Sequence, residues 1–103
     1  MTNQFKRELI DNLDLSKIKQ KLCMEFDSGG YDWPVIEAEK AISSYRKFLK
    51  TVLSIENNKI LKGLQPDAIQ DIVWHTHILF TEKNHQDCQN IFGEYLHHVP
   101  KLN

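Results

Sequence analysis

The sequence predicts an all-α fold, a compact bundle of about four helices in a single domain that spans residues 1–103. Three observations lead to this prediction. Four segments repeat their apolar residues at steps of three and four, which is the spacing of one helix face. Residues that start or stop helices separate these segments. Only residues 72–80 are rich in strand-forming residues, and no second convincing strand is present to pair with them.

The first predicted helix follows Asp14, whose side chain can cap it. Its apolar positions keep helical spacing and are Leu15, Ile18, Leu22 and Phe26. The run Asp27-Ser28-Gly29-Gly30 should end this helix, because glycine readily adopts the left-handed conformations that close helices.

The second predicted helix is the clearest in the chain and starts at Asp32-Trp33-Pro34, since proline is accepted in a first helical turn. Its apolar stripe consists of Val35, Ala38, Ile42, Tyr45, Leu49 and Val52. Basic residues on the other side are typical of a solvated face. Residues 56–63 then form a predicted connection.

The third predicted helix opens at Pro66-Asp67 and is apolar around nearly its whole circumference. Its apolar residues are Ile69, Ile72, Val73, Trp74, Ile78, Leu79 and Phe80. Such a helix should lie in the centre of the fold, with Trp74 buried. Residues 72–80 would also suit a buried strand, but the missing partner strand favours the helix.

The fourth predicted helix begins at Thr81, a plausible cap, and Pro100 should end it. Its apolar stripe consists of His85, Cys88, Ile91, Phe92, Tyr95 and Leu96. We expect it to pair antiparallel with the third helix, which would bring His77 close to His85 and His75 towards Cys88.

Composition narrows the class of protein. Thirteen basic and fourteen acidic residues give a formal net charge of −1, which gives no support to a nucleic-acid partner. The apolar runs are too short for a membrane span, and the polar start has no signal-peptide core. Cys23 and Cys88 are interpreted as reduced thiols, so the expected location is cytoplasmic.

All five histidines lie from residue 75 onward, together with Cys88. Imidazole and thiolate are zinc ligands, so we predict a divalent transition metal, zinc above all, bound through some of His75, His77, Cys88 and His98. His75 and His77 are two residues apart and point about 200° away from each other on a regular helix. Either the helix is distorted between them, or one of them packs instead of binding.

The segment Asp71-Ile72-Val73-Trp74-His75-Thr76-His77-Ile78-Leu79, followed by Asp87-Cys88, Phe92-Gly93 and Leu96, resembles the signature of glycine-rich domain-containing proteins. The resemblance covers the last third of the chain. It implies a helical domain with a WHxH plus DC core, which here consists of Trp74, His75, His77, Asp87 and Cys88. It implies no settled activity.

This chain departs from that family in two ways. It has four glycines in all and therefore no glycine-rich tail. Asn84 stands where the family usually has tyrosine, which puts a role for an aromatic hydroxyl there in doubt. The pair His97-His98 occurs in only part of the family, so a metal site built on it would not be general.

Two other functions stay open beside the metal site. One is a metal-free protein-interaction module in which the WHxH segment locks the central helix, with an unknown protein partner. The other is a metal-dependent or thiol-dependent enzyme, in which Cys88 would use a nearby histidine as its base. The apolar face around Cys88 should hide the thiol, and no further catalytic motif accompanies it.

Overall fold

The computed structural model describes residues 2–56 and 65–96, and these form five α-helices and one 3₁₀ turn with no strand among them. The helices are α1 (Thr2–Asp11), α2 (Ser16–Cys23), α3 (Val35–Glu56), α4 (Ala68–Leu79) and α5 (Thr81–Phe92), and the turn η1 is Phe26–Ser28. The all-α prediction is confirmed. Residues 72–79 lie inside α4, so the strand alternative is wrong.

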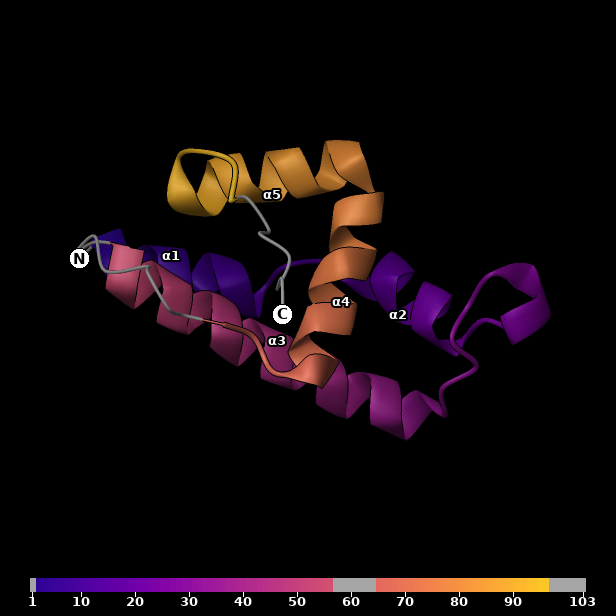
Figure 1. The fold of residues 1–103 in the computed structure, drawn as a ribbon. Helices are drawn as coiled ribbons and strands as arrows, with labels where there is room; N and C mark the ends of the chain where they lie inside the picture. The colour runs from indigo at the N-terminus through magenta and orange to yellow at the C-terminus, as the bar shows by residue number, and fades with distance from the viewer. Residues whose placement is uncertain (1, 57–64, 97–103) are drawn as a thin grey trace.

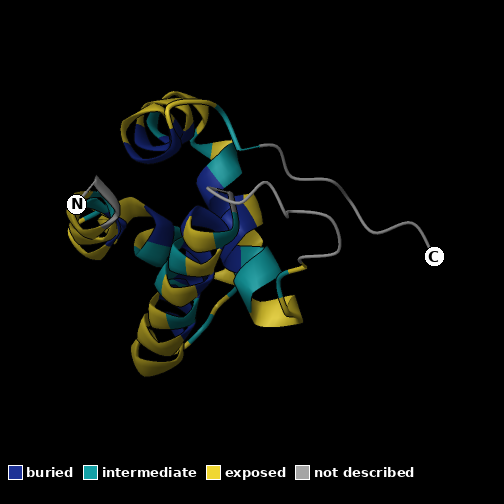
Figure 2. Cartoon of the chain, turned by 90° about the vertical axis from the view of Figure 1, so that its left-hand side faces the viewer, coloured by how far each residue is buried: buried dark blue, intermediate teal, exposed yellow. Residues whose placement is uncertain are grey.

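The longest helix, α3, is the centre of the packing and contacts α1, α2 and α4. Helix α4 crosses α3, and α5 packs against both α4 and α1 (Figure 1). Buried residues face inward where these helices meet, and exposed residues cover the outer faces (Figure 2). The stripe predicted for α3 forms much of this core: Ala38, Ile42, Tyr45, Leu49 and Val52 are all buried, whereas Val35 is exposed.

Helix α1 was not expected from the sequence. Its apolar residues are few, and Phe5 is exposed while Ile10 is fully buried. The guanidinium of Arg46 on α3 donates hydrogen bonds to the backbone oxygens of Ile10 (2.6 Å) and Leu13 (3.1 Å). One side chain of the longest helix therefore adds hydrogen bonds to carbonyl groups at the end of α1 and just after it.

Helix α2 ends three residues earlier than predicted, and Phe26 lies in η1 with 75% of its surface exposed. Asp14 is not the residue directly before the helix, but its carboxylate accepts hydrogen bonds from the Ser16 backbone amide (3.1 Å) and hydroxyl (2.6 Å). The paired glycines were predicted to end this helix, but α2 ends before them at Cys23, and Gly29, with a φ of 90°, closes η1 instead.

The chain then folds back along α2 before α3 begins. The backbone amides of Asp32 and Trp33 donate to the oxygens of Met24 (2.8 Å) and Leu22 (3.0 Å). Only glycine fits at position 30, because a Cβ there would lie 2.2 Å from the backbone oxygen of Met24. These contacts fix Trp33 and Pro34 at the start of α3.

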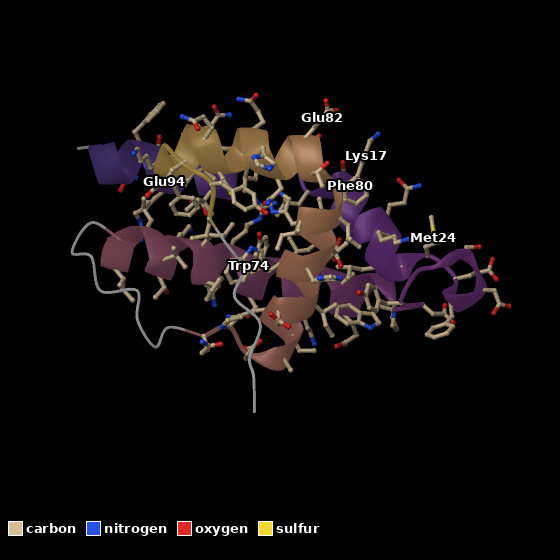
Figure 3. All side chains as sticks on the ribbon, turned by 45° about the horizontal axis from the view of Figure 1, so that its top comes forward. Lys17, Met24, Trp74, Phe80, Glu82 and Glu94 are labelled. Carbon is tan, nitrogen blue, oxygen red and sulfur yellow. The ribbon has the colours of Figure 1, made fainter. Side chains whose placement is uncertain are left out.

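Helix α4 begins where the sequence predicted. The Asp67 carboxylate accepts from the Gln70 amide (2.7 Å), and the Gln70 side chain accepts from the Asp67 amide (2.9 Å), which makes a capping box. Trp74 is 6% exposed, and its ring lies 5.2 Å from that of Phe48 on α3 (Figure 3). The predicted burial of Trp74 is confirmed, although Ile69 and Leu79 leave α4 partly exposed.

Helix α5 leaves α4 at a corner made by one residue, Phe80 (Figures 1 and 3). The expected antiparallel pairing of these two helices is therefore wrong, because a single residue with a φ of −89° and a ψ of 72° turns the chain without reversing it. Thr81 is the first helical residue rather than the cap, and Gly93, with a φ of 77°, ends the helix well before Pro100. No described helix is both long and apolar enough to cross a membrane.

Candidate functional site

The imidazole of His77 joins three helices by hydrogen bonds. His77 lies on α4 and is 2% exposed. Its Nδ1 is 2.7 Å from the hydroxyl of Tyr45 on α3, and its Nε2 is 2.8 Å from Oδ2 of Asp87 on α5. The rings of Tyr45 and His77 also meet edge to face, with centroids 5.7 Å apart. We call Tyr45, His77 and Asp87 the buried triad.

The ionisation of Asp87 and the protonation of Tyr45 indicate which atoms donate hydrogen bonds in the buried triad. Burial alone raises the pKa of Asp87, but hydrogen bonds from His77 and Lys83 outweigh it and hold that pKa below its ordinary value. An ionised Asp87 can only accept, so Nε2–H of His77 donates to it. In a neutral imidazole, Nδ1 then carries the lone pair and accepts the O–H of Tyr45. Burial, and then the neighbouring Cys88 and Asp87, raise the pKa of Tyr45 well above its usual value, which keeps this hydroxyl protonated.

Lys83 extends the triad towards the surface. Its Nζ lies 3.0 Å from the same Oδ2 of Asp87, one helical turn away on α5, and its side chain is about a quarter exposed. The negative charge of Asp87 is thus balanced by a lysine on its own helix. A buried carboxylate that is both hydrogen-bonded and paired carries a much smaller desolvation cost than an isolated one.

Cys88 follows Asp87 on α5 and is also buried. Its Sγ lies 3.8 Å from Oδ1 of Asn84, one turn earlier, so the thiol donates a weak hydrogen bond to that oxygen. Nδ2 of Asn84 has no hydrogen-bond partner within the described part of the chain. Both cysteines are free thiols, as predicted.

His75 and His85, the other histidines among the described residues, do not join this cluster. His75 is exposed, on the side of α4 that the two-residue offset from His77 predicts. His85 is exposed and stacks on the ring of Tyr95, with centroids 4.3 Å apart. His97 and His98 lie outside the described residues.

Of the four predicted metal ligands, His77 and Cys88 are buried and His75 is exposed. Within residues 2–56 and 65–96 there is no group of three or more His, Cys, Asp or Glu side chains that could hold a metal ion. A metal on Nδ1 of His77 would displace the Tyr45 hydroxyl, and a metal on Nε2 would displace Asp87. The set His75, His77, Cys88 and His98 stays a prediction, because His98 is not among the described residues.

The buried triad repeats the order hydroxyl, base and carboxylate that activates nucleophiles in hydrolases. Here the hydroxyl belongs to a tyrosine that is 1% exposed. A reacting group must reach its substrate, and in this conformation the packing around Tyr45 prevents that. In this conformation the arrangement links α3, α4 and α5 by hydrogen bonds.

Sequence reasoning found His77 and Cys88 but not the role of Tyr45, which appeared only as a member of an apolar stripe. Asp87 entered through the family resemblance alone. A usable signal was available for Tyr45, since a tyrosine on a predicted core face needs a buried hydrogen-bond partner, and an interior histidine is able to provide one.

A second feature is an open groove of about 480 Å³ between the start of α3 and the start of α4. We call it the α3–α4 groove. Its lining residues come from the approach to α3, from α3 itself and from the beginning of α4: Trp33, Pro34, Glu37, Lys40, Ala41, Ser44, Asp67 and Ile69. Ile36 beside it is 62% exposed and Ile69 is 46% exposed, so apolar surface is open to solvent here.

These features define a class of protein, a small all-α domain organised around a buried tyrosine–histidine–aspartate triad. The chain belongs to the UCP032817-like family, whose model matches residues 6–103. No curated protein and no solved structure matches it.

Proposed function

We propose that this chain is a metal-free helical domain that acts by binding a protein surface. In this proposal the Trp74–His77 segment holds α4 against α3 and α5. The observation that carries the proposal is that both ring nitrogens of His77 are hydrogen-bonded within the protein. Nδ1 lies 2.7 Å from the Tyr45 hydroxyl, and Nε2 lies 2.8 Å from Oδ2 of Asp87. A histidine that ligates a metal must keep one nitrogen for it. The engagement of both ring nitrogens supports a structural role for His77 over a role as one of the four predicted ligands.

The family resemblance supports the same proposal. Trp74, His77, Asp87 and Cys88 of the WHxH plus DC pattern are all buried at the junction of α4 with α3 and α5. A pattern made of buried, mutually bonded residues is typical of a structural core. We extend this interpretation to the glycine-rich domain-containing proteins as a proposal, with His75 as the exposed exception.

The α3–α4 groove supports the binding part of the proposal. Exposed isoleucines beside an open hollow are typical of surfaces that meet a partner. The groove is lined by both apolar and charged side chains, and such mixed surfaces are characteristic of non-obligate protein interfaces.

The competing proposal is a divalent metal such as zinc on His75, His77, Cys88 and His98. Metal analysis of protein purified without a histidine tag separates the two. We expect well under one metal ion per chain and no change in melting temperature with chelator. His77→Gln should lower the melting temperature without changing metal content. One equivalent of metal that disappears in Cys88→Ser would instead establish the metal site.

A further inference from the structure

A hollow between α1 and α3 gathers positive charge from two helices. These helices pack side by side (Figure 1), and the hollow has a volume of about 260 Å³. Its lining residues are Arg7 of α1 and Lys47, Lys50, Thr51 and Ser54 of α3. All five are basic or carry a hydroxyl group, and none is acidic. We call this feature the α1–α3 basic hollow.

The charges of the hollow are not balanced within the described part of the chain. Lys50 forms an ion pair with the carboxylate of Asp11 on α1. Within residues 2–56 and 65–96, the exposed side chains of Arg7 and Lys47 make no hydrogen bond or ion pair. The three lining cations and the one carboxylate that pairs with them therefore have a net charge of +2.

This arrangement is unfavourable without an anion. Lys47 and Lys50 are three positions apart, so they are neighbours on the surface of α3, where like charges repel each other. The basic side of α3 was expected to be a solvated face, but the docking of α1 adds Arg7 from a second helix to the same hollow. An anion bound among these three cations would replace their repulsion with attraction.

We propose that the α1–α3 basic hollow binds a phosphate group, either free or as the monoester of a small molecule. A phosphate monoester has a charge of about −1.5 to −2 at pH 7, which matches the net charge of the site. Arg7 offers a planar fork of N–H donors that suits two phosphate oxygens, and Lys47 and Lys50 act as point charges. The Thr51 hydroxyl already donates to the Lys47 backbone oxygen at 3.1 Å, so we assign binding to the cations.

The size of the hollow limits the ligand. Pockets that hold drug-sized molecules measure roughly 300–1,000 Å³, and this hollow is smaller. It suits one phosphate group with a small organic part rather than a nucleic-acid backbone, in agreement with the formal net charge of −1 of the whole chain. The site lies apart from the α3–α4 groove and does not rest on the proposed function.

Isothermal titration calorimetry of the full chain, without a histidine tag, tests the site with sodium phosphate and with glycerol 3-phosphate. We expect one binding site per chain. Arg7→Gln and Lys47→Gln should each weaken binding by about tenfold or more, because each removes a charge-assisted hydrogen bond. Tighter binding of glycerol 3-phosphate assigns the group to a monoester, whereas tighter binding of inorganic phosphate assigns it to the free ion.

Lys40→Gln is the matched control, because it removes the same charge from an exposed position of α3 in the α3–α4 groove. It should leave phosphate binding unchanged, and circular dichroism should show that all variants stay helical. Phosphate should also raise the melting temperature of wild type more than sodium chloride does at equal ionic strength, because a bound ligand stabilises the folded chain. Equal effects of the two salts, or phosphate binding that Arg7→Gln and Lys47→Gln leave unchanged, overturn the proposal.

Discussion

Nε2 of His77 and Oδ2 of Asp87 are joined by a 2.8 Å hydrogen bond, although the two residues lie on different helices and ten positions apart. The bond exists because Phe80 turns the chain between α4 and α5, which brings Asp87 in the second turn of α5 against His77 of α4.

The hydroxyl of Tyr45 can be removed without changing the shape of the core. Tyr45→Phe leaves Nδ1 of His77 buried without its donor, which should lower the free energy of unfolding by about 1–3 kcal/mol. Urea denaturation of the variant and of wild type measures this difference in the free energy of unfolding. Tyr31→Phe, at a half-buried tyrosine that packs on Trp33, is the control and should have little effect. Equal stability of Tyr45→Phe and wild type would show that this hydrogen bond contributes nothing.

The carboxylate of Asp87 makes stability depend on pH at the acid end. Its pKa is lower in the folded protein than in the unfolded chain, so its contribution is complete above the unfolded value of about 3.9. That contribution is lost as the pH falls through the folded pKa, because protonation then favours the unfolded chain. Urea titrations between neutral and strongly acidic pH should show a shallower acid decline in Asp87→Asn than in wild type.

The control for the loss of one negative charge is Asp27→Asn, in the exposed turn η1. If the free energy of unfolding falls equally steeply with acidification in wild type and in Asp87→Asn, the assignment of this pH dependence to Asp87 is contradicted.

Trp74 packs between α4 and α3 and should be among the most costly residues to truncate. Trp74→Ala removes a side chain that is 6% exposed, and we expect a loss of about 3–5 kcal/mol. Phe26→Ala removes an aromatic ring that is 75% exposed and should change stability by no more than about 0.5 kcal/mol. A near-neutral Trp74→Ala would be incompatible with the observed packing on Phe48.

The two thiols should differ in reactivity. Cys23 is half-buried, whereas Cys88 is buried, so native protein should be alkylated at Cys23 first and at Cys88 only slowly. Mass spectrometry of peptides after timed alkylation measures both rates, with protein in urea as the control in which the two become similar. A Cys23–Cys88 disulfide in untreated protein would overturn the free-thiol assignment.

Arg46 should control how firmly α1 is held. Arg46→Lys keeps the positive charge but cannot reach two carbonyl oxygens with a planar fork, so we expect faster hydrogen exchange in α1 with little change in α4. Lys47→Glu, at the exposed neighbouring position, is the control. Unchanged exchange in α1 would mean that apolar contacts alone hold it.

The fold class, the start of α4 and the burial of Trp74 were predictable because each depends on local chemistry: helical spacing, a capping box and an apolar circumference. Helix α1 was not predictable in this way, since its docking depends on the distant Arg46. The corner at Phe80 was missed because no glycine or proline marks it. That single turn is why His77 meets Asp87 instead of His85.

The buried triad also has a consequence for the order of folding. Its three residues lie on three helices, and Tyr45 and His77 are 32 positions apart, so their bonds can close only after α3, α4 and α5 have docked. Interactions that form late stabilise the native state more than the folding transition state. We therefore expect the triad mainly to slow unfolding. Substitutions in it should raise the rate of unfolding and leave the rate of refolding nearly unchanged.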